Sequence, residues 1–392
     1  MSEGTWRSCR ALAYPALVGK PEPGELVLLN TTALERGLGT GGYALIVAIP
    51  DRIPVDVPMG PGHLVKARYT PLQAMVLGVD EQESEHHDLL ADADDLFGLP
   101  VIVADLHSSL PAIIAGLRHP RPNCRVGYVM TDGGALPAWF SRSVAGLRAA
   151  GWIDVCITAG QAFGGDLEAV SVHSALLAAK HVAAVDVVIV TQGPGNLGTG
   201  TRWGFSGVQA GEVLNAAAVL NGRPVAALRI SGADARERHR GISHHSLTAY
   251  GRVALAPADV VVPDLTLDPT ELPAPGSSGS TGRAGDPHGS PIPPGLAHLA
   301  HLASRAGLAG LPALGRLVDR QVRQLVTPHG RHSGVRVPTA GLLSALRQSP
   351  VTLSTMGRGL DDDPGAFLAA AAAGAHARTL LGAPNQRPSP NP

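Results

Sequence analysis

Residues 185–230 read VDVVIVTQGPGNLGTGTRWGFSGVQAGEVLNAAAVLNGRPVAALRI, and this stretch decides the fold. The run 185–191 is apolar and β-branched, which predicts a buried strand. A glycine-rich turn follows, and then a helix over about 207–220 that ends at Asn221-Gly222, a common helix stop signal. A second apolar strand is expected over 225–230. Because parallel strands need a crossover helix between them, the stretch predicts a β-α-β unit of a parallel sheet.

The same alternation extends on both sides of this unit. Further strands are expected at 101–105, 126–131, 153–158 and 259–262, and further helices at about 139–149 and 167–183. The strands are continuous hydrophobic runs, as expected for a sheet that helices cover on both faces. The predicted fold class is therefore α/β, with a mostly parallel, Rossmann-like sheet and flanking helices.

The chain before the core has a different pattern. Residues 1–68 contain short apolar runs separated by Gly and Pro, which predicts a small β-rich domain built as a barrel or meander. The α/β core is expected over residues 69–262.

The chain after the core starts with a compositional break. Residues 263–294 are rich in Pro, Gly and Ser and predict a disordered linker. Residues 295–383 are expected to form a C-terminal helical segment that completes the core, followed by a tail at 384–392. The elements expected in this segment are helices at 296–306 and 340–346, a strand at 351–354, and a last helix that starts at the acids and proline of 361–364.

The composition excludes several classes of protein. Lys and Arg number 31 against 32 Asp and Glu, so a broad basic surface for nucleic acid or anionic membrane is not expected. Cys9, Cys124 and Cys156 form no C-x-x-C pair and no even framework, which favours a reducing compartment. The N-terminus carries no apolar signal-peptide core, and no run approaches the roughly 18 apolar residues of a membrane span. We therefore expect a cytoplasmic protein that binds neither nucleic acid nor membrane.

The glycine-rich turn 191–206 is expected at the carboxyl end of the sheet, where open α/β folds bind ligands. Glycines let the backbone approach a ligand closely, and hydroxyls and a guanidinium add donors for an anion. The ligand-binding candidates in this turn are Gly193, Gly195, Gly198, Thr199, Gly200, Thr201, Arg202 and Ser206. Gly193-x-Gly195-x-x-Gly198 matches a dinucleotide fingerprint only in form, because it does not follow the first strand and the helix begins well after Gly198. A long structural turn is the alternative.

The loop 231–246 follows the next strand of the chain and is rich in arginine and histidine. Arg236, Arg238 and Arg240 are expected to clamp a carboxylate or phosphate. A second set, His239, His244 and His245, contains candidates for catalytic proton transfer. No metal ligands are assigned, because no H-E-x-x-H spacing is present and adjacent histidines point apart on regular structure. A metal site and a solvated polar loop remain the alternatives.

Other strand ends carry polar groups that could reach the same rim. Asp132 is a further catalytic candidate, with helix capping as the competing role. Asp105 and His107 follow another strand, and Arg358 follows the strand expected at 351–354. A Walker loop and a G-x-S-x-G elbow are both absent from the sequence.

Several long phrases resemble a known family. They are 24–32 (GELVLLNTT), 38–42 (LGTGG) and 62–71 (GHLVKARYTP), together with the two loops above, and they resemble the bacterial domain of unknown function 3866 family over almost the whole chain. This resemblance implies no activity. Residues 198–204 (GTGTRWG) also look like the redox loop of glycine and sarcosine reductase B-type proteins, but Leu197, Gly200 and Trp203 stand where those proteins carry cysteine or selenocysteine. Thiol or selenol reduction is therefore not expected.

Three functions remain open from the sequence, and no cofactor is identified. The leading hypothesis is an enzyme or binding protein for a small anionic metabolite, with a homo-oligomer compatible with it. The second is a metal-dependent hydrolase that uses His239, His244 or His245 with Asp132 or Asp105. The third is a non-catalytic assembly or regulatory factor whose N-terminal β domain contacts a partner.

Overall fold

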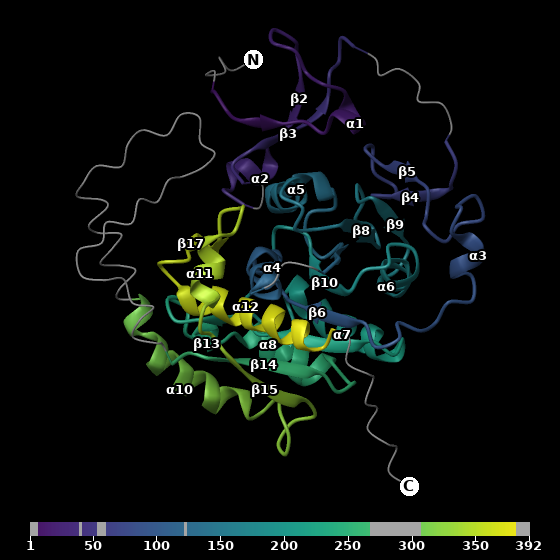
Figure 1. Ribbon diagram of the computed structural model, residues 1–392. Coiled ribbons are helices and arrows are strands. Elements are labelled where there is room, and N and C mark those ends of the chain that lie inside the picture. Colours follow the sequence, from purple (N-terminus) through teal and green to yellow (C-terminus); the bar gives the residue numbers. More distant parts are fainter. Residues whose placement is uncertain (1–6, 39–40, 53–59, 121–123, 267–306, 382–392) are drawn as a thin grey trace.

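The computed structural model describes residues 7–38, 41–52, 60–120, 124–266 and 307–381. Its centre is a sheet in which every neighbouring pair of strands is parallel (Figure 1). The strand order within the described ranges is β15 (Ser333–Pro338), β14 (Asp259–Asp264), β11 (Arg223–Ala227), β6 (Pro100–Val103), β10 (Val187–Gln192), β7 (Val126–Thr131), β8 (Val155–Ala159) and β9 (Leu167–Ala169). The α/β, Rossmann-like fold class expected from the sequence is confirmed.

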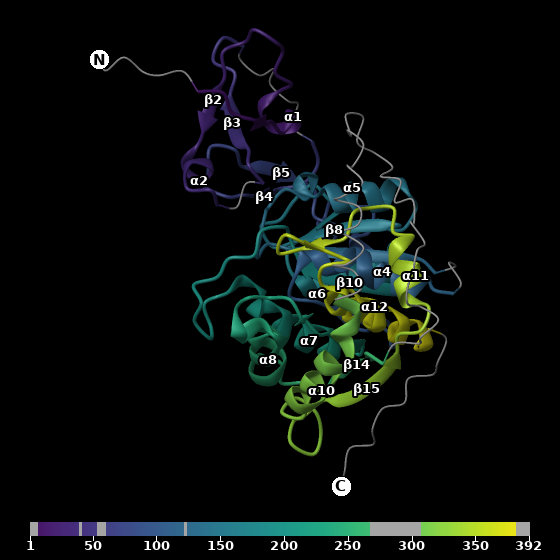
Figure 2. The same ribbon diagram turned by 90° about the vertical axis from the view of Figure 1, so that its left-hand side faces the viewer.

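Helices cover the sheet on both faces (Figure 2). One face carries α4 (Leu110–Arg118), α11 (Leu342–Arg347) and α12 (Pro364–Thr379). The other carries α6 (Val172–His181) and α7 (Ala210–Val219). Every residue of β6, β7, β8 and β10 is buried, which explains why these strands are continuous apolar runs in the sequence.

The strand order creates a crevice at the carboxyl ends of β6 and β10. The chain leaves β6 through α4 toward β7 and leaves β10 through α7 toward β11, so the two connections run in opposite directions over opposite faces. Open α/β sheets bind their ligands at such a switch point. We expected the strands before the glycine turn and the histidine loop to be neighbours, but β6 lies between β10 and β11. The β-α-β pattern predicts parallel pairing, but it does not determine which strands become neighbours.

The C-terminal part completes the sheet as well as its helical layer. It contains α10 (Leu311–Val322), the edge strand β15, α11, the short hairpin β16 (Ser354–Thr355) and β17 (Arg358–Gly359), and α12. The strand β15 was not expected, because most of its residues are exposed or half-buried and its apolar pattern is weak. The start of the last helix is confirmed, with Asp363 as N-cap and Pro364 in the first turn.

The N-terminal part is built from short strands. They form the three-stranded sheet β1 (Ala11–Leu12), β3 (Ala44–Ala48), β2 (Leu28–Asn30) and the hairpin β4 (Leu64–Lys66), β5 (Ala74–Val76). Short helices accompany them: α1 (Pro15–Val18), α2 (Thr32–Glu35) and, after the hairpin, α3 (His87–Leu90). The boundary at residue 68 stays a prediction, and it falls in the turn between β4 and β5.

Several local boundaries differ from the expected ones. Of the strand expected at 351–354, only Ser354 lies in a strand, the two-residue β16 (Ser354–Thr355). The helix expected from residue 167 starts at Val172, because Ser171 and Ser174 form a capping box and residues 167–169 pair with β8 as β9. The strand expected over 225–230 ends at Ala227, and Ile230–Ser231 (β12) instead pairs with Gly241–Ile242 (β13). The helix expected at 296–306, the tail at 384–392 and most of the linker at 263–294 lie outside the described residues. Within the described ranges, no helix is both long enough and apolar enough to span a bilayer.

Candidate functional site

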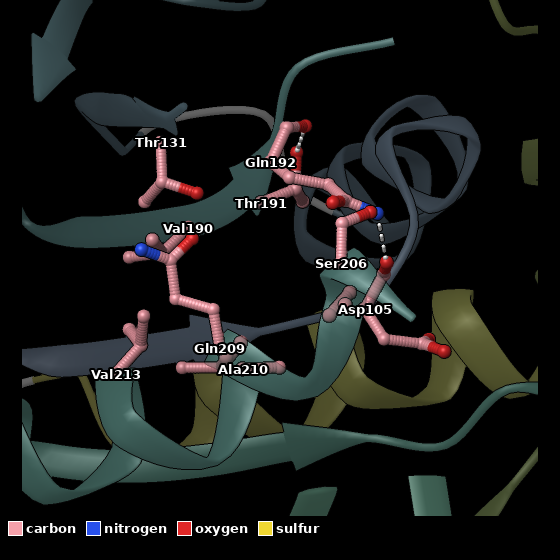
Figure 3. Close-up of a pocket in the computed structure, with 12 residues that line it drawn as sticks. Asp105, Thr131, Val190, Thr191, Gln192, Ser206, Gln209, Ala210 and Val213 are labelled. Carbon is pink, nitrogen blue, oxygen red and sulfur yellow. Dashed lines mark hydrogen bonds between the residues drawn. The ribbon is translucent and has the colours of Figure 1, made fainter. Parts of the chain in front are cut away.

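Four loops meet around the carboxyl ends of β6 and β10. They follow β6, β10 and β11, and the fourth is the C-terminal segment 352–358. A crevice of about 340 Å³ lies between them, with Leu106, His107, Gln192, Asn196 and Met356 among its walls. The Gln192 side chain holds two of the loops together, because its Nε2 donates to the Asp105 carbonyl at 2.9 Å and to Asn196 Oδ1 at 2.9 Å. Figure 3 shows the contact between Gln192 and Asp105 beside a pocket of about 10 Å³, which has room for about one water molecule at most.

The glycine turn divides into two parts. Its first part lines the crevice through Gly193 and Gly195. The second part closes on itself, since Gly198 bridges to Phe205 and the Thr199 amide donates to the Gly204 carbonyl at 2.8 Å. Only the first part therefore lies where a ligand in the crevice would contact it.

The hydroxyls of the turn are already bonded within it. Thr201 Oγ1 lies 3.1 Å from Thr199 Oγ1 and accepts from the Gly204 amide, and Ser206 Oγ accepts from the Leu197 amide at 3.0 Å. Arg202 is exposed near the tip. Gly193 also has a packing role that the sequence did not reveal, because a Cβ there would stand 2.3 Å from the Ala135 carbonyl oxygen.

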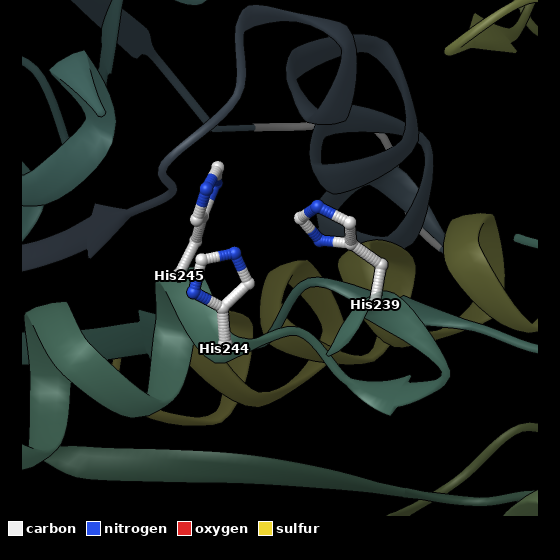
Figure 4. A group of neighbouring side chains, drawn as sticks. All are labelled: His239, His244 and His245. Atoms are coloured by element: carbon white, nitrogen blue, oxygen red, sulfur yellow. The ribbon is translucent and has the colours of Figure 1, made fainter. Parts of the chain in front are cut away.

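Three imidazoles converge beside this turn. His239 ends a short 3-10 helix (Glu237–His239), and the other two histidines start α8 (His244–Thr248). The ring centroids lie 4.4 Å apart for His244 and His245, 4.9 Å for His239 and His244, and 5.0 Å for His239 and His245. Figure 4 shows the rings turned toward a shared space. The expectation that His244 and His245 point apart is wrong, because successive residues of a helix are separated by about 100° rather than by the 180° of a strand.

The glycine turn and the histidine loop are in contact even though β6 separates their strands. Phe205 stacks on His245 with a centroid distance of 3.8 Å and an interplanar angle of 2°. Arg238 lies against Gly200, where a Cβ would be 3.7 Å from its Nη2. Ser243, the N-cap of α8, accepts a hydrogen bond from the His245 amide. The segment after β10 thus supports one ring of the cluster directly.

A buried charged pair underlies the cluster. The Asp105 side chain is 1% exposed, and neither of its carboxylate oxygens has a hydrogen-bond partner in the described structure. Its Oδ2 lies 4.0 Å from Arg229 Nη1 and 3.9 Å from His245 Nδ1. Arg229 Nη1 in turn lies 3.0 Å from His245 Nδ1. Sequence reasoning missed Arg229, although a charged residue near the end of an apolar strand was a usable signal.

Burial and the neighbouring arginines determine the charge state of the rings. Burial, then the positive charge of Arg229, lowers the pKa of His239 to about 3 and that of His245 to about 2. Burial, then the charge of Arg238, also lowers the pKa of His244. Burial raises the pKa of Asp105, and Arg229 opposes that rise. The imidazoles are therefore neutral at neutral pH, which suits them to donating, accepting or ligating rather than to cycling a proton.

The arginines of the loop serve different partners. Arg236 is committed to Asp234, with Nε–Oδ1 and Nη2–Oδ2 distances of 2.9 Å. Arg238 and Arg202 have no carboxylate within 4.0 Å in the described part of the chain. Arg240 lines a separate cavity of about 590 Å³ against α10. Of the three arginines expected to clamp an anion, Arg238 is thus the one left unpaired near the histidines.

The other strand-end candidates lie in different places. Arg358 reaches the rim as expected, where it bridges Asp234 and Asp363 at 3.2 Å each. Asp132 accepts a hydrogen bond from the Gln161 amide at 2.9 Å, in the turn after β8. Asp132 caps no described helix. It follows β7, whereas the histidine loop follows β11, and both β6 and β10 lie between these two strands in the sheet.

Comparisons with known proteins identify a family and nothing closer. The model of the family described as "Protein of unknown function (DUF3866)" matches residues 10–374. No curated protein and no solved structure matches the chain, so the local likeness to reductase B-type proteins gains no support.

Proposed function

The chain belongs to the DUF3866 family, whose description assigns no function, and we propose from the site itself that the protein binds a small anionic metabolite, as an enzyme or a binding protein. One observation carries this proposal. The Arg229 side chain is 9% exposed, yet its guanidinium makes a single side-chain hydrogen bond in the described structure, to His245. A buried guanidinium has five N–H donors and favours a carboxylate or phosphate partner. Asp105 does not fill that role, because its nearest oxygen lies 4.0 Å away.

The surroundings of Arg229 suit a ligand of metabolite size. Arg229 and Arg358 line a small cavity whose walls Leu106, Ser108 and Met356 also line the crevice of about 340 Å³. That volume is at the lower end of the range for small-molecule sites. We propose that the anionic group of the ligand pairs with Arg229 and that its body lies in the crevice. The exposed, unpaired Arg238 and Arg202 would then attract the ligand from solution.

The experiment is a thermal-shift screen of phosphorylated and carboxylated metabolites, followed by calorimetric titration of each hit. We expect Arg229→Gln to weaken binding about 10- to 100-fold, as the loss of a charge-assisted hydrogen bond does. Arg202→Ala/Arg238→Ala is expected to slow association and to make it less dependent on salt. The matched control is Arg331→Ala, at an exposed arginine on a different loop.

A second variant keeps the test sharp if Arg229→Gln folds poorly. Ser143 lines the crevice from α5 (Arg142–Ala149) and is half-buried, so Ser143→Leu fills the crevice without altering the core. Hits that bind equally to the wild type, to Arg229→Gln and to Ser143→Leu would place the ligand elsewhere and end the proposal. For the compartment, we retain the proposal of a cytoplasmic protein, which its three unpaired cysteines support.

A further inference from the structure

We propose that His239, His244 and His245 bind one divalent transition-metal ion, of the zinc class, and that the buried carboxylate of Asp105 orients His245 for this role. The candidate ligand atoms of the three histidines all lie within 4.8 Å of one another. This inference goes beyond anion binding and does not depend on it, since the proposed ligands are the three imidazoles.

Each ring keeps a nitrogen available for a metal. His239 Nδ1 is held by Ser243 Oγ at 2.8 Å, so Nε2 is the remaining nitrogen of that ring. A guanidinium only donates, so His245 Nδ1 accepts from Arg229, and the ring proton is on Nε2. His245 therefore binds a metal through Nε2 once that proton has moved to Nδ1. His244 Nε2 is buried and has no hydrogen-bond partner in the described structure. A buried polar atom without a partner is costly, and a metal ion would satisfy it.

The spacing and the donor type suit zinc or a similar ion. A tetrahedral zinc site with Zn–N bonds of about 2.0–2.1 Å places its nitrogens roughly 3.3 Å apart, so the cluster needs to contract by about 1.5 Å or less. The contraction would bring together two short elements, Glu237–His239 and His244–Thr248, which carry the three rings. Three neutral imidazoles suit zinc, iron, nickel or copper better than magnesium or calcium. Such a set also leaves a fourth position for water or a ligand.

Asp105 supplies the second, independent observation. A carboxylate that is 1% exposed and bonded through neither oxygen needs an explanation. When a metal binds Nε2 of a histidine, the Nδ1–H of that ring requires an acceptor, which is commonly a carboxylate. Asp105 Oδ2 is 3.9 Å from His245 Nδ1, so a shift of about 1 Å creates that hydrogen bond. The Arg229 guanidinium would then no longer bond to the ring, which leaves its N–H donors for the anionic ligand.

The experiment uses the full chain, stripped of metal with a chelator and titrated with Zn²⁺ against a chromophoric competitor. We expect one equivalent to bind to the wild type, and His239→Ala, His244→Ala and His245→Ala each to lose at least about 100-fold in affinity. His329→Ala, at an exposed histidine outside the cluster, is the matched control and should bind like the wild type. Equal zinc binding by the wild type and the triple alanine variant, or no stoichiometric binding by the wild type, would overturn the site.

Two further measurements do not depend on how well the histidine variants fold. X-ray absorption of the Zn²⁺-loaded wild type should show three imidazole ligands, and a coordination shell without them would refute the assignment. Asp105→Asn should weaken metal binding about 10- to 100-fold and change the visible spectrum of the Co²⁺ form, as expected when the partner of a ligating histidine is altered. Asp259→Asn is its control, because Asp259 contacts His376 in a separate carboxylate–histidine pair at 2.7 Å. An unchanged affinity and spectrum in Asp105→Asn would remove its positioning role. No metabolite is present in these titrations, so a negative result leaves the anion site to its own test.

Discussion

Helices α4 and α12 pack so closely that one methyl group added between them, at Gly116, should destabilise the protein. Helix α4 begins directly after the loop that carries Asp105 and packs on α12 through glycine. A Cβ at Gly116 would stand 1.9 Å from the Ala371 carbonyl oxygen and 2.8 Å from the Ala371 Cα. Both are backbone atoms of α12, so no side chain can rotate away. Gly116→Ala therefore forces the two helices apart by more than 1 Å.

The magnitude follows from two opposing contributions. Alanine in a helix interior is favoured over glycine by about 1 kcal/mol. Overpacking a tight core costs about 1–3 kcal/mol when side chains can adjust, and a clash with rigid backbone lies at or above the upper limit. We expect Gly116→Ala to lower the free energy of unfolding by at least about 2 kcal/mol. For a chain of this length, that corresponds to a fall in melting temperature of about 2–3 °C or more.

The control is the same substitution at a helical glycine with room for a methyl group. In α10, the nearest atom to a Cβ at Gly315 is Leu265 Cβ at 3.4 Å, an ordinary contact. Gly315→Ala should therefore be neutral or raise the free energy of unfolding by up to about 1 kcal/mol. Urea unfolding followed by circular dichroism measures both variants under the same conditions. A Gly116→Ala protein as stable as Gly315→Ala would refute the close α4–α12 contact, and with it the placement of the loop before α4.

Three further predictions concern buried polar groups. Burial lowers the pKa of His107 to about 4, so between pH 4 and 6.5 the unfolded chain binds more protons than the folded chain does. The contribution of the neutral His107 to the free energy of unfolding is therefore complete above pH 6.5. It falls by no more than about 3 kcal/mol as the pH drops to 4. Urea midpoints across this range should fall less for His107→Gln than for the wild type, and parallel curves would contradict the assignment. Lys66→Met should lower the free energy of unfolding by about 3–5 kcal/mol, because it leaves the Glu168 carboxylate buried without the Lys66 ammonium, which is 3.6 Å away in the wild type. Lys66→Met/Glu168→Gln should recover part of this loss in the same assay. Tyr250→Phe should cost about 1 kcal/mol, because the Tyr250 hydroxyl lies 3.0 Å from the Val103 carbonyl and 3.1 Å from that of Ala227; an unchanged urea midpoint would show that neither bond stabilises the fold.

Much of the fold follows from local pattern. The strand 126–131 was expected with the bounds that β7 has, and the N-terminus of α12 was expected from its acids and proline. These elements are predictable because the side chains that specify them are close together in the sequence. The edge strand β15 was not predictable in this way. Few of its residues are buried, so its sequence shows little hydrophobic periodicity.

The candidate site was predictable in its residue types and not in its geometry. The histidines and Arg238 were identified because they follow a strand of a parallel sheet. Their convergence depends on the Ser243 cap and on Phe205. Phe205 stacks on His245 although the two residues are far apart in the sequence.

The identity of the buried strands, the start of the last helix and the concentration of polar groups at strand ends are specified by local sequence, because hydrophobic periodicity and capping act over a few positions. The insertion of β6 between β10 and β11, and the meeting of Asp105 with Arg229 and His245, depend on packing between segments far apart in the chain. The free energy that selects this strand order is summed over the whole core, so no short pattern contains it. Only in the folded chain does an isolated aspartate become a buried carboxylate beside Arg229 and His245.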